Sequence, residues 1–243
     1  MVDLPAWWYR PIDFVVAASA HSWAVERMRA KLASDPGFIE TESDRMVLRD
    51  FGGAPSTDPG ARMNDEDERQ EARLREQARE DYCNMLRRTE SDMWGLGIAG
   101  LFHQWERSTK HVIAAFSPKL LAKLERKDFN GLCGLLERLG FDVKQCAAFA
   151  GLETARMISN TVKHGEGREF CTLITRHPEV VAGFKPSRWR KDPRPDDLRF
   201  TVGEFDAAAA AIGEIWVAFE KVNHNLSPPR GGMATRGTRP DGR

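Results

Sequence analysis

The stretch DVKQCAAFAGLETARMISNTVKHG, residues 142–165, reads as one helix with both of its ends defined by sequence. Asp142 is suited to cap the first turn, because its carboxylate can accept a hydrogen bond from an otherwise unpaired backbone N–H. Gly165 follows the last helical residue, where glycine readily adopts the left-handed conformation that closes helices. The pattern therefore predicts a single helix between these two residues. Its apolar stripe of mostly small side chains comprises Cys146, Ala147, Ala150, Ala155, Ile158 and Val162.

A second face of the same helix is polar. At 100° per residue five polar side chains fall together: Glu153, Arg156, Asn160, Lys163 and His164. Solvent is the commonest reason for such a face, and His164 has a structural reading as a cap in the last helical turn. Its functional reading is an acid or base near neutrality, because an unperturbed histidine has a pKa of about 6.5. Asn160 is either a structural amide at a helix end or a group that orients the histidine or a phosphate oxygen.

Composition limits the class of protein. The chain has 243 residues, 41% hydrophobic and 30% charged, which is typical of a globular protein and too polar for a membrane protein. Lysine plus arginine and aspartate plus glutamate both number 36, so net charge does not mark a nucleic-acid binder. No apolar run approaches the length of a membrane span. The run at 14–20 ends in an A-x-A-like pattern, but Asp13 and the preceding tryptophans argue against a secretory signal.

The cysteines point to a reducing compartment. Cys83, Cys133, Cys146 and Cys171 are widely spread, with no CxxC pair and no histidine at zinc spacing. Buried thiols in the cytoplasm are the plain interpretation. We therefore expect a cytoplasmic protein with no metal and no cofactor.

Helical periodicity recurs along most of the chain, and nothing alternates as a strand would. Gly95, Gly97 and Gly100 open the strongest core pattern, where they either permit close helix approach or mark a kink. The sequence predicts an all-α fold, an antiparallel bundle over 64–226, with a charged helix-and-loop extension at 1–63 and a disordered tail at 227–243. In the N-terminal half the expected helices run from Pro11 towards Leu32, from Glu66 to Arg88 and through Ile98 to Phe116. In the C-terminal half they run from Pro118 to Lys127, from Phe129 to Leu139, over 168–175 and from Val202 to Val222. A Thr201–Glu204 capping box precedes the last of them.

The segment KPSRWRKDPRPDDLR, residues 185–199, is the most basic part of the bundle. It contains six basic residues, three acidic residues and three prolines, so it is expected to be irregular. Arg188, Trp189 and Arg190, with Lys191 and Arg194, could follow an RNA backbone and stack a base. The alternative is a solvated linker.

The segment SNTVKHG, Ser159 to Gly165, resembles the signature of HEPN domains, which are small helical bundles found in bacterial toxin, abortive-infection and RNA-processing proteins. The context is similar too: a helix containing FHQWERSTKHV (102–112) precedes the signature, Gly167 to Leu173 with Pro178 follows it, and a last helix begins near LRFTVGEF (198–205). The resemblance covers about residues 91–225 and leaves the first ninety residues unexplained.

The resemblance implies metal-independent RNA cleavage by an arginine and a histidine a few residues apart, in a composite cleft formed by two protomers. Asn160 and His164 match the pattern, but Ser159 stands where the arginine is expected. Arg156, one turn earlier, is the candidate replacement. His164, Arg156 and Asn160 are thus the predicted catalytic residues, and the predicted substrate-binding residues are Lys163, Ser159, Arg188, Trp189 and Arg190.

Three readings follow. The first is a HEPN-like, dimeric, cytoplasmic endoribonuclease or toxin-like effector of phage-defence type, with an antitoxin or another protein as a possible partner. The second is a non-catalytic HEPN-like module that binds RNA, a nucleotide or a protein, which Ser159 favours. The third is a helical interaction protein whose likeness to the signature is accidental.

Overall fold

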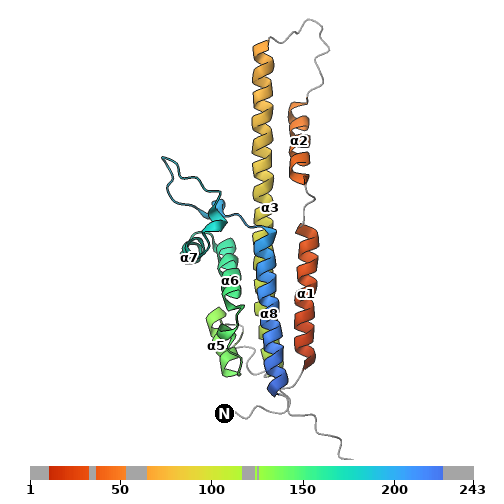
Figure 1. The fold of residues 1–243 in the computed structure, drawn as a ribbon, viewed down its shortest axis with the longest axis vertical. Coiled ribbons are helices and arrows are strands. Elements are labelled where there is room, and N and C mark those ends of the chain that lie inside the picture. The colour runs from red at the N-terminus through yellow and green to blue at the C-terminus, as the bar shows by residue number, and fades with distance from the viewer. Residues whose placement is uncertain (1–10, 33–36, 53–64, 117–123, 125, 227–243) are drawn as a thin grey trace, which may run out of the picture. The chain divides into compact units, whose positions relative to one another are not determined.

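The computed structural model describes residues 11–32, 37–52, 65–116, 124 and 126–226, and every structural statement below concerns these residues. Their regular structure is entirely helical, which confirms the all-α fold class (Figure 1). Most of the helix expected at 118–127 and the expected disordered tail lie outside the described residues. The α-helices are α1 (Pro11–Leu32), α2 (Phe38–Phe51), α3 (Asp65–Phe116), α5 (Phe129–Arg138), α6 (Phe149–His164), α7 (Arg168–Arg176) and α8 (Val202–Leu226).

The chain divides into two compact units. Unit 1 comprises Met1–Trp23, Gln104–Ala150 and Ala210–Arg243, and unit 2 comprises Ala24–His103 and Gly151–Ala209. Aromatic side chains pack together in unit 1, where the Phe141 and Phe219 rings stack with centroids 4.6 Å apart. In unit 2 the Trp94 ring of α3 meets the Phe205 ring of α8 with centroids 5.3 Å apart. The candidate site residues all belong to unit 2.

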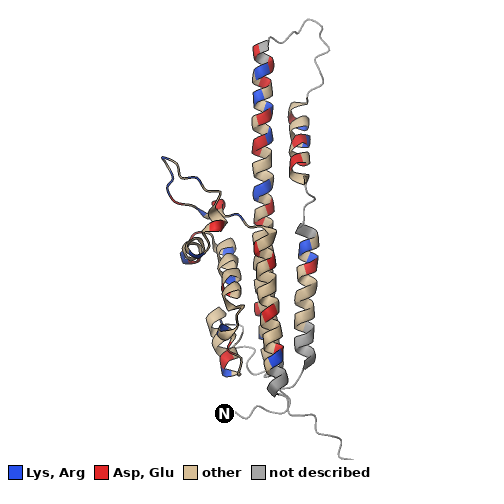
Figure 2. Cartoon of the chain, viewed as in Figure 1, with Lys and Arg blue, Asp and Glu red and all other residues tan. Residues whose placement is uncertain are grey.

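One continuous helix, α3, replaces the two helices expected between 66 and 116. Its 52 residues run through Gly95, Gly97 and Gly100 without a break. Charged residues are concentrated in its N-terminal part (Figure 2), whereas residues 93–105 include no lysine, arginine, aspartate or glutamate. The core stripe is as expected, with Ile98, Leu101, Phe102, Trp105, Thr109 and Val112 all buried. The separation into two helices was wrong because propensity at three glycines is outweighed by packing on this buried face.

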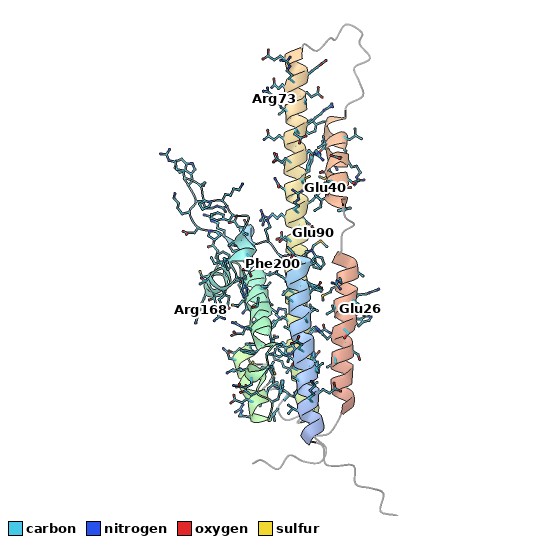
Figure 3. The ribbon with its side chains drawn as sticks, in the orientation of Figure 1. Glu26, Glu40, Arg73, Glu90, Arg168 and Phe200 are labelled. Atoms are coloured by element: carbon cyan, nitrogen blue, oxygen red, sulfur yellow. The ribbon has the colours of Figure 1, made fainter. Side chains whose placement is uncertain are left out.

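Close approach is the role of the first of these glycines. A Cβ at Gly95 would lie 2.7 Å from Cδ2 of Phe200 and 3.3 Å from Cγ2 of Val162. Phe200 is held against α3, where its N–H donates to Oγ of Ser91 at 2.7 Å (Figure 3). Gly95 therefore lets the chain before α8 and the end of α6 both pack on α3.

The helix α2 was not expected, since its apolar pattern is weak. It runs antiparallel to the N-terminal part of α3 and is held mainly by polar contacts. Sγ of Cys83 lies 3.1 Å from Oγ of Ser43, and Arg79 pairs with Asp44 at 2.6 Å. The Tyr82 hydroxyl donates to Asp50. Such contacts leave little periodic apolar signal, which is why the segment looked irregular.

The predicted single helix at 142–165 is wrong at its N-terminal end. Asp142 does cap a turn, accepting a bond from Lys144 N at 3.1 Å, but the turn is a short 3₁₀ helix, η3 (Val143–Gln145). Cys146 is extended, with φ −71° and ψ 136°, and α6 begins only at Phe149. Val143, in the 3₁₀ turn that precedes the interruption between η3 and α6, is completely buried. At the other end Gly165 has φ +70°, as expected of a helix-closing glycine.

The remaining expected elements are confirmed. Helix α5 is followed by Gly140 with φ +91°, and α7 is followed by the short 3₁₀ helix η4 (Pro178–Val181). At the start of α8 the Glu204 carboxylate accepts a bond from Thr201 N at 2.8 Å, while Thr201 Oγ1 accepts one from Gly203 N at 3.1 Å. The 185–199 segment is irregular except for a short 3₁₀ helix, η5 (Pro195–Asp197).

Candidate functional site

Helix α7 covers the first half of the polar face of α6. Arg176 pairs with Glu153 at 3.4 Å near the C-terminal end of α7, and Glu169 pairs with Arg156 at 2.9 Å near its N-terminal end. Beside the first pair, Oγ1 of Thr154 lies 3.0 Å from Nε2 of His177. These contacts hold α7 against α6, and the two helices cross at a large angle (Figure 1). Half of the face that the sequence marks as a candidate site is therefore a helix–helix contact.

His177 is a residue whose place the sequence did not reveal. It follows α7, and its ring bridges Thr154 of α6 and Glu179 of η4, with Nδ1 3.0 Å from the Glu179 carboxylate. Its position before Pro178 was the only signal in the sequence. The ring fixes the end of α7 to α6.

Arg156 does not join His164 in one site within the chain. Its side chain is about four-fifths buried, and its guanidinium is bound to Glu169. His164 lies eight positions further along the helix, which is about 12 Å along the axis at 1.5 Å per residue. The predicted catalytic pair of Arg156 and His164 is thus not assembled within one protomer, because α7 holds Arg156 elsewhere.

Ser159, at the position of the expected arginine, faces the interior. Its side chain is fully buried, and its Oγ lies 3.3 Å from Nε2 of His103 on α3. The expected contact between Ser159 and a substrate is therefore not available in this structure. Ser159 instead links α6 to α3 through its contact with His103, which is itself exposed to solvent.

The last turn of α6 forms the open half of the polar face. Lys163 and His164 are exposed, and Asn160 is half-buried. Within the described ranges none of these three side chains makes a hydrogen bond or an ion pair, in contrast to Glu153 and Arg156. The structure therefore brings together three of the predicted residues on an accessible surface.

The basic segment forms a pinned loop and not a loose linker. Asp197 binds Arg190 through two parallel bonds of 2.9 Å, and its Oδ2 also accepts a bond from Arg194 N at 2.8 Å. The Arg190 guanidinium lies over the Phe184 ring, 4.8 Å from its centroid. Arg190 is thus engaged inside the loop, and its expected role as a substrate-binding residue stays a prediction.

The electrostatics of Asp197 agree with this arrangement. Burial acts to raise the pKa of its carboxyl group, but the bonds from Arg194 N and from Arg190 outweigh burial and leave the pKa below its usual value. The carboxylate is therefore charged at neutral pH, and the loop keeps its two-bond clamp.

Internal pairing makes the outer surface of the loop more basic than its composition suggests. Of its three acidic residues, Asp197 is bound to Arg190 and Asp196 pairs with Arg88 of α3 at 3.0 Å. Five cations of the loop take part in no ion pair within the described chain, against the single carboxylate of Asp192: Lys185, Arg188, Lys191, Arg194 and Arg199. Arg199 donates to the backbone carbonyl oxygens of Asp196 and Leu198. A count of charges along the sequence could not separate the internal pairs from the outward cations.

A cleft joins this loop to the turn after α6. Its volume is about 500 Å³, and one wall is the Glu166–Gly167 turn with Phe170 and Cys171 of α7. Residues 189–194 form the other wall. The turn begins two residues beyond His164, and Arg168 opens α7 beside it (Figure 3). The structure thus sets Lys191 and Arg194 across a cleft from the segment that directly follows Lys163 and His164.

Comparisons with protein families, with curated proteins and with solved structures gave no match to this chain. In the described ranges no helix has the length and apolarity needed to cross a membrane. Nor do three or more His, Cys, Asp or Glu side chains gather there in a position to share a metal ion. The candidate site is therefore defined by the geometry of unit 2.

Proposed function

We propose that this chain is a HEPN-like helical protein that binds RNA at the cleft between residues 166–171 and 189–194. The observation that carries the proposal is the pair of outward cations in one wall of this cleft, Lys191 and Arg194. The lining also includes the carboxylates of Glu166 and Asp192, and Lys163 lies three residues before Glu166. Phosphates are bound mainly by such side chains, and their neutralisation supplies most of the affinity of sequence-independent binding. The exposed Trp189 adds a surface for a base.

Binding without catalysis is the form of the function that the geometry supports best. The expected motif arginine is absent at the buried Ser159, and Arg156 is bound to Glu169. A phosphorane needs a cation beside the reacting phosphate, and within one chain Arg156 does not supply it next to His164. Binding needs only the outward cations of the cleft.

The charge reversal Lys191→Glu/Arg194→Glu tests this proposal. We expect it to weaken binding of a single-stranded RNA at least tenfold, and to reduce the slope of log affinity against log salt by about 1.4, since each phosphate contact contributes about 0.7. Fluorescence anisotropy at several salt concentrations measures both quantities. Arg73→Glu is the matched control, because Arg73 is an exposed arginine in the N-terminal part of α3 (Figure 3). Equal affinities of the double variant and the wild type would contradict the proposal.

Metal-independent cleavage of RNA is the second candidate. It is favoured by His164, which is exposed and makes no hydrogen bond within the described residues, next to Lys163 and one turn after Asn160. Here His164 moves a proton, Asn160 orients it, and Lys163 stabilises charge on the phosphate. The nuclease hypothesis includes a homodimer, because a partner protomer can supply the cation that Arg156 does not place next to His164. An antitoxin or other protein partner stays a prediction of the resemblance.

Cleavage of a labelled RNA in EDTA separates the two candidates. If the protein is a nuclease, His164→Ala should lower the cleavage rate about 100-fold or more while RNA affinity stays unchanged. Arg156→Ala should retain most of the activity, because Arg156 is bound to α7. Absence of cleavage by the purified wild-type protein would exclude the nuclease, and full activity of His164→Ala would exclude His164 as its proton-transfer residue. Either result leaves the binding proposal intact.

A further inference from the structure

Trp189 has the most exposed large apolar side chain among the described residues. Its exposed fraction is 88%, compared with 64% for Trp23 and 3% for Trp216. Tryptophan is a large side chain that usually gains from burial, and exposed aromatic residues are enriched where a partner binds. Such complete exposure on an ordered loop indicates a contact surface.

The loop is built so that this indole projects outward. Ser187 N donates to the Arg190 carbonyl oxygen at 2.8 Å, and Arg190 N donates back to Ser187 Oγ at 3.2 Å. These two bonds close a four-residue turn with Arg188 and Trp189 at its tip. Below the turn, the bonds of Arg190 to Asp197 and its packing over Phe184 fix the base of the loop.

We propose that Trp189 stacks an unpaired base of a single-stranded nucleic acid, while Arg188, Lys191 and Arg194 contact its phosphates. This inference rests on the proposed binding function and names its ligand class. Arg190 and Asp197 are positioning residues, which act by holding the turn that carries Trp189. The Arg188 guanidinium lies 5.2 Å from the Trp189 ring centroid and extends the stacking surface with a cation.

The chemistry of the surface selects this ligand. In a duplex the faces of the bases are covered by their neighbours, so an indole on a projecting turn has no face to stack on except at an end. An acidic peptide would satisfy the cations but offers no flat ring for the indole. A single strand supplies both the phosphates and the free base faces, and stacking tolerates any base.

The direct test compares ligands and tryptophan variants by fluorescence anisotropy. The probes are a single-stranded RNA and a single-stranded DNA of about a dozen nucleotides, the blunt duplex of the same sequence, and a glutamate-rich peptide as competitor. We expect at least tenfold tighter binding of single strands than of the duplex. Trp189→Ala should weaken single-strand binding by about 5- to 150-fold, the range of one lost stacking contact. Trp189→Tyr should keep most of the affinity, and Trp23→Ala, at another exposed tryptophan, should keep all of it.

A double-mutant cycle tests the positioning role. Asp197→Asn removes the charged clamp with almost no change in shape, and it should weaken single-strand binding about tenfold in the wild-type background. In the Trp189→Ala background the same change should have almost no effect, because the residue acts through the tryptophan. A general loss of structure would instead weaken both proteins equally.

The outcomes separate this inference from the proposed function. Equal binding of duplex and single strand, an unchanged affinity of Trp189→Ala, or displacement of RNA by the peptide at matched charge would overturn the stacking proposal. An equal effect of Asp197→Asn in both backgrounds would overturn the positioning role. If charge reversal at Lys191 and Arg194 still weakens binding in these cases, the proposed function survives while its ligand class is wrong.

Discussion

Restoring the expected arginine by Ser159→Arg is expected to destabilise the protein by about 4 kcal/mol or more. Ser159 is fully buried between α6 and α3, so a long side chain has no room there. Overpacking alone costs about 1–3 kcal/mol, and a buried charge without a partner adds several kcal/mol. Since domains unfold at about 5–15 kcal/mol, the variant should be largely unfolded in modest denaturant. Urea unfolding followed by circular dichroism measures the change.

Two controls give this prediction its meaning. Ser159→Ala removes only the contact with His103 and should cost about 1 kcal/mol. Asn160→Arg places the same arginine at the next position, which is half-buried on the polar face, and should change stability by less than about 1 kcal/mol. A Ser159→Arg protein as stable as the wild type would show that the position opens to solvent, and would return the arginine of the motif to the catalytic argument.

The variant Gly95→Val is expected to cost about 3 kcal/mol. Its Cβ would lie 2.7 Å from Cδ2 of Phe200, whose ring is buried and whose N–H is bound to Ser91. The ring therefore has little freedom to move aside, and overpacking outweighs any gain in helix propensity. Thermal or urea unfolding of the purified variant measures the loss.

Gly100→Ala is the control for Gly95, because it lies in the same helix and the same unit. Its Cβ would lie 3.1 Å from Cε of Met28, the end of a flexible side chain. We expect it to be neutral or to stabilise the protein by up to about 1 kcal/mol through helix propensity. Opposite signs at the two glycines would confirm that close approach is confined to Gly95, whereas equal effects would contradict it.

The fold class could be predicted because helix signals are local. Caps and periodicity marked the ends of α5 and α7 and the start of α8, and the stripe from Ile98 to Val112 identified the buried face of α3. The errors occurred where tertiary packing overrides propensity. The glycines at 95, 97 and 100 looked like a boundary between two helices, yet α3 is continuous through them because it packs there. The small residues before Phe149 looked helical, yet α6 begins only at Phe149.

The candidate site was harder to predict, because its chemistry depends on which charges are already paired. Asn160, Lys163 and His164 fall together as expected from helical spacing. Spacing could not show that Glu169 binds Arg156 or that Asp197 binds Arg190. Both arginines looked available to a ligand, and both partners lie on elements that approach only in the folded chain.

The alkylation rate of Cys171 reports whether the cleft is occupied, because this cysteine lines it. Cys171 is exposed and lines it, Cys83 and Cys133 are buried, and burial together with Asp142 raises the pKa of the half-buried Cys146 thiol. Because the thiolate is the reactive form, Cys171 should be alkylated first in the folded protein. Cys146 lies in unit 1 and serves as an internal control.

The most direct measurement of the central claim is therefore the alkylation rate of Cys171, followed by mass spectrometry, with and without saturating single-stranded RNA. If RNA occupies the cleft between 166–171 and 189–194, the rate at Cys171 should fall at least fivefold while the rate at Cys146 stays unchanged. RNA that is bound by anisotropy while Cys171 reacts at its unliganded rate would contradict the account.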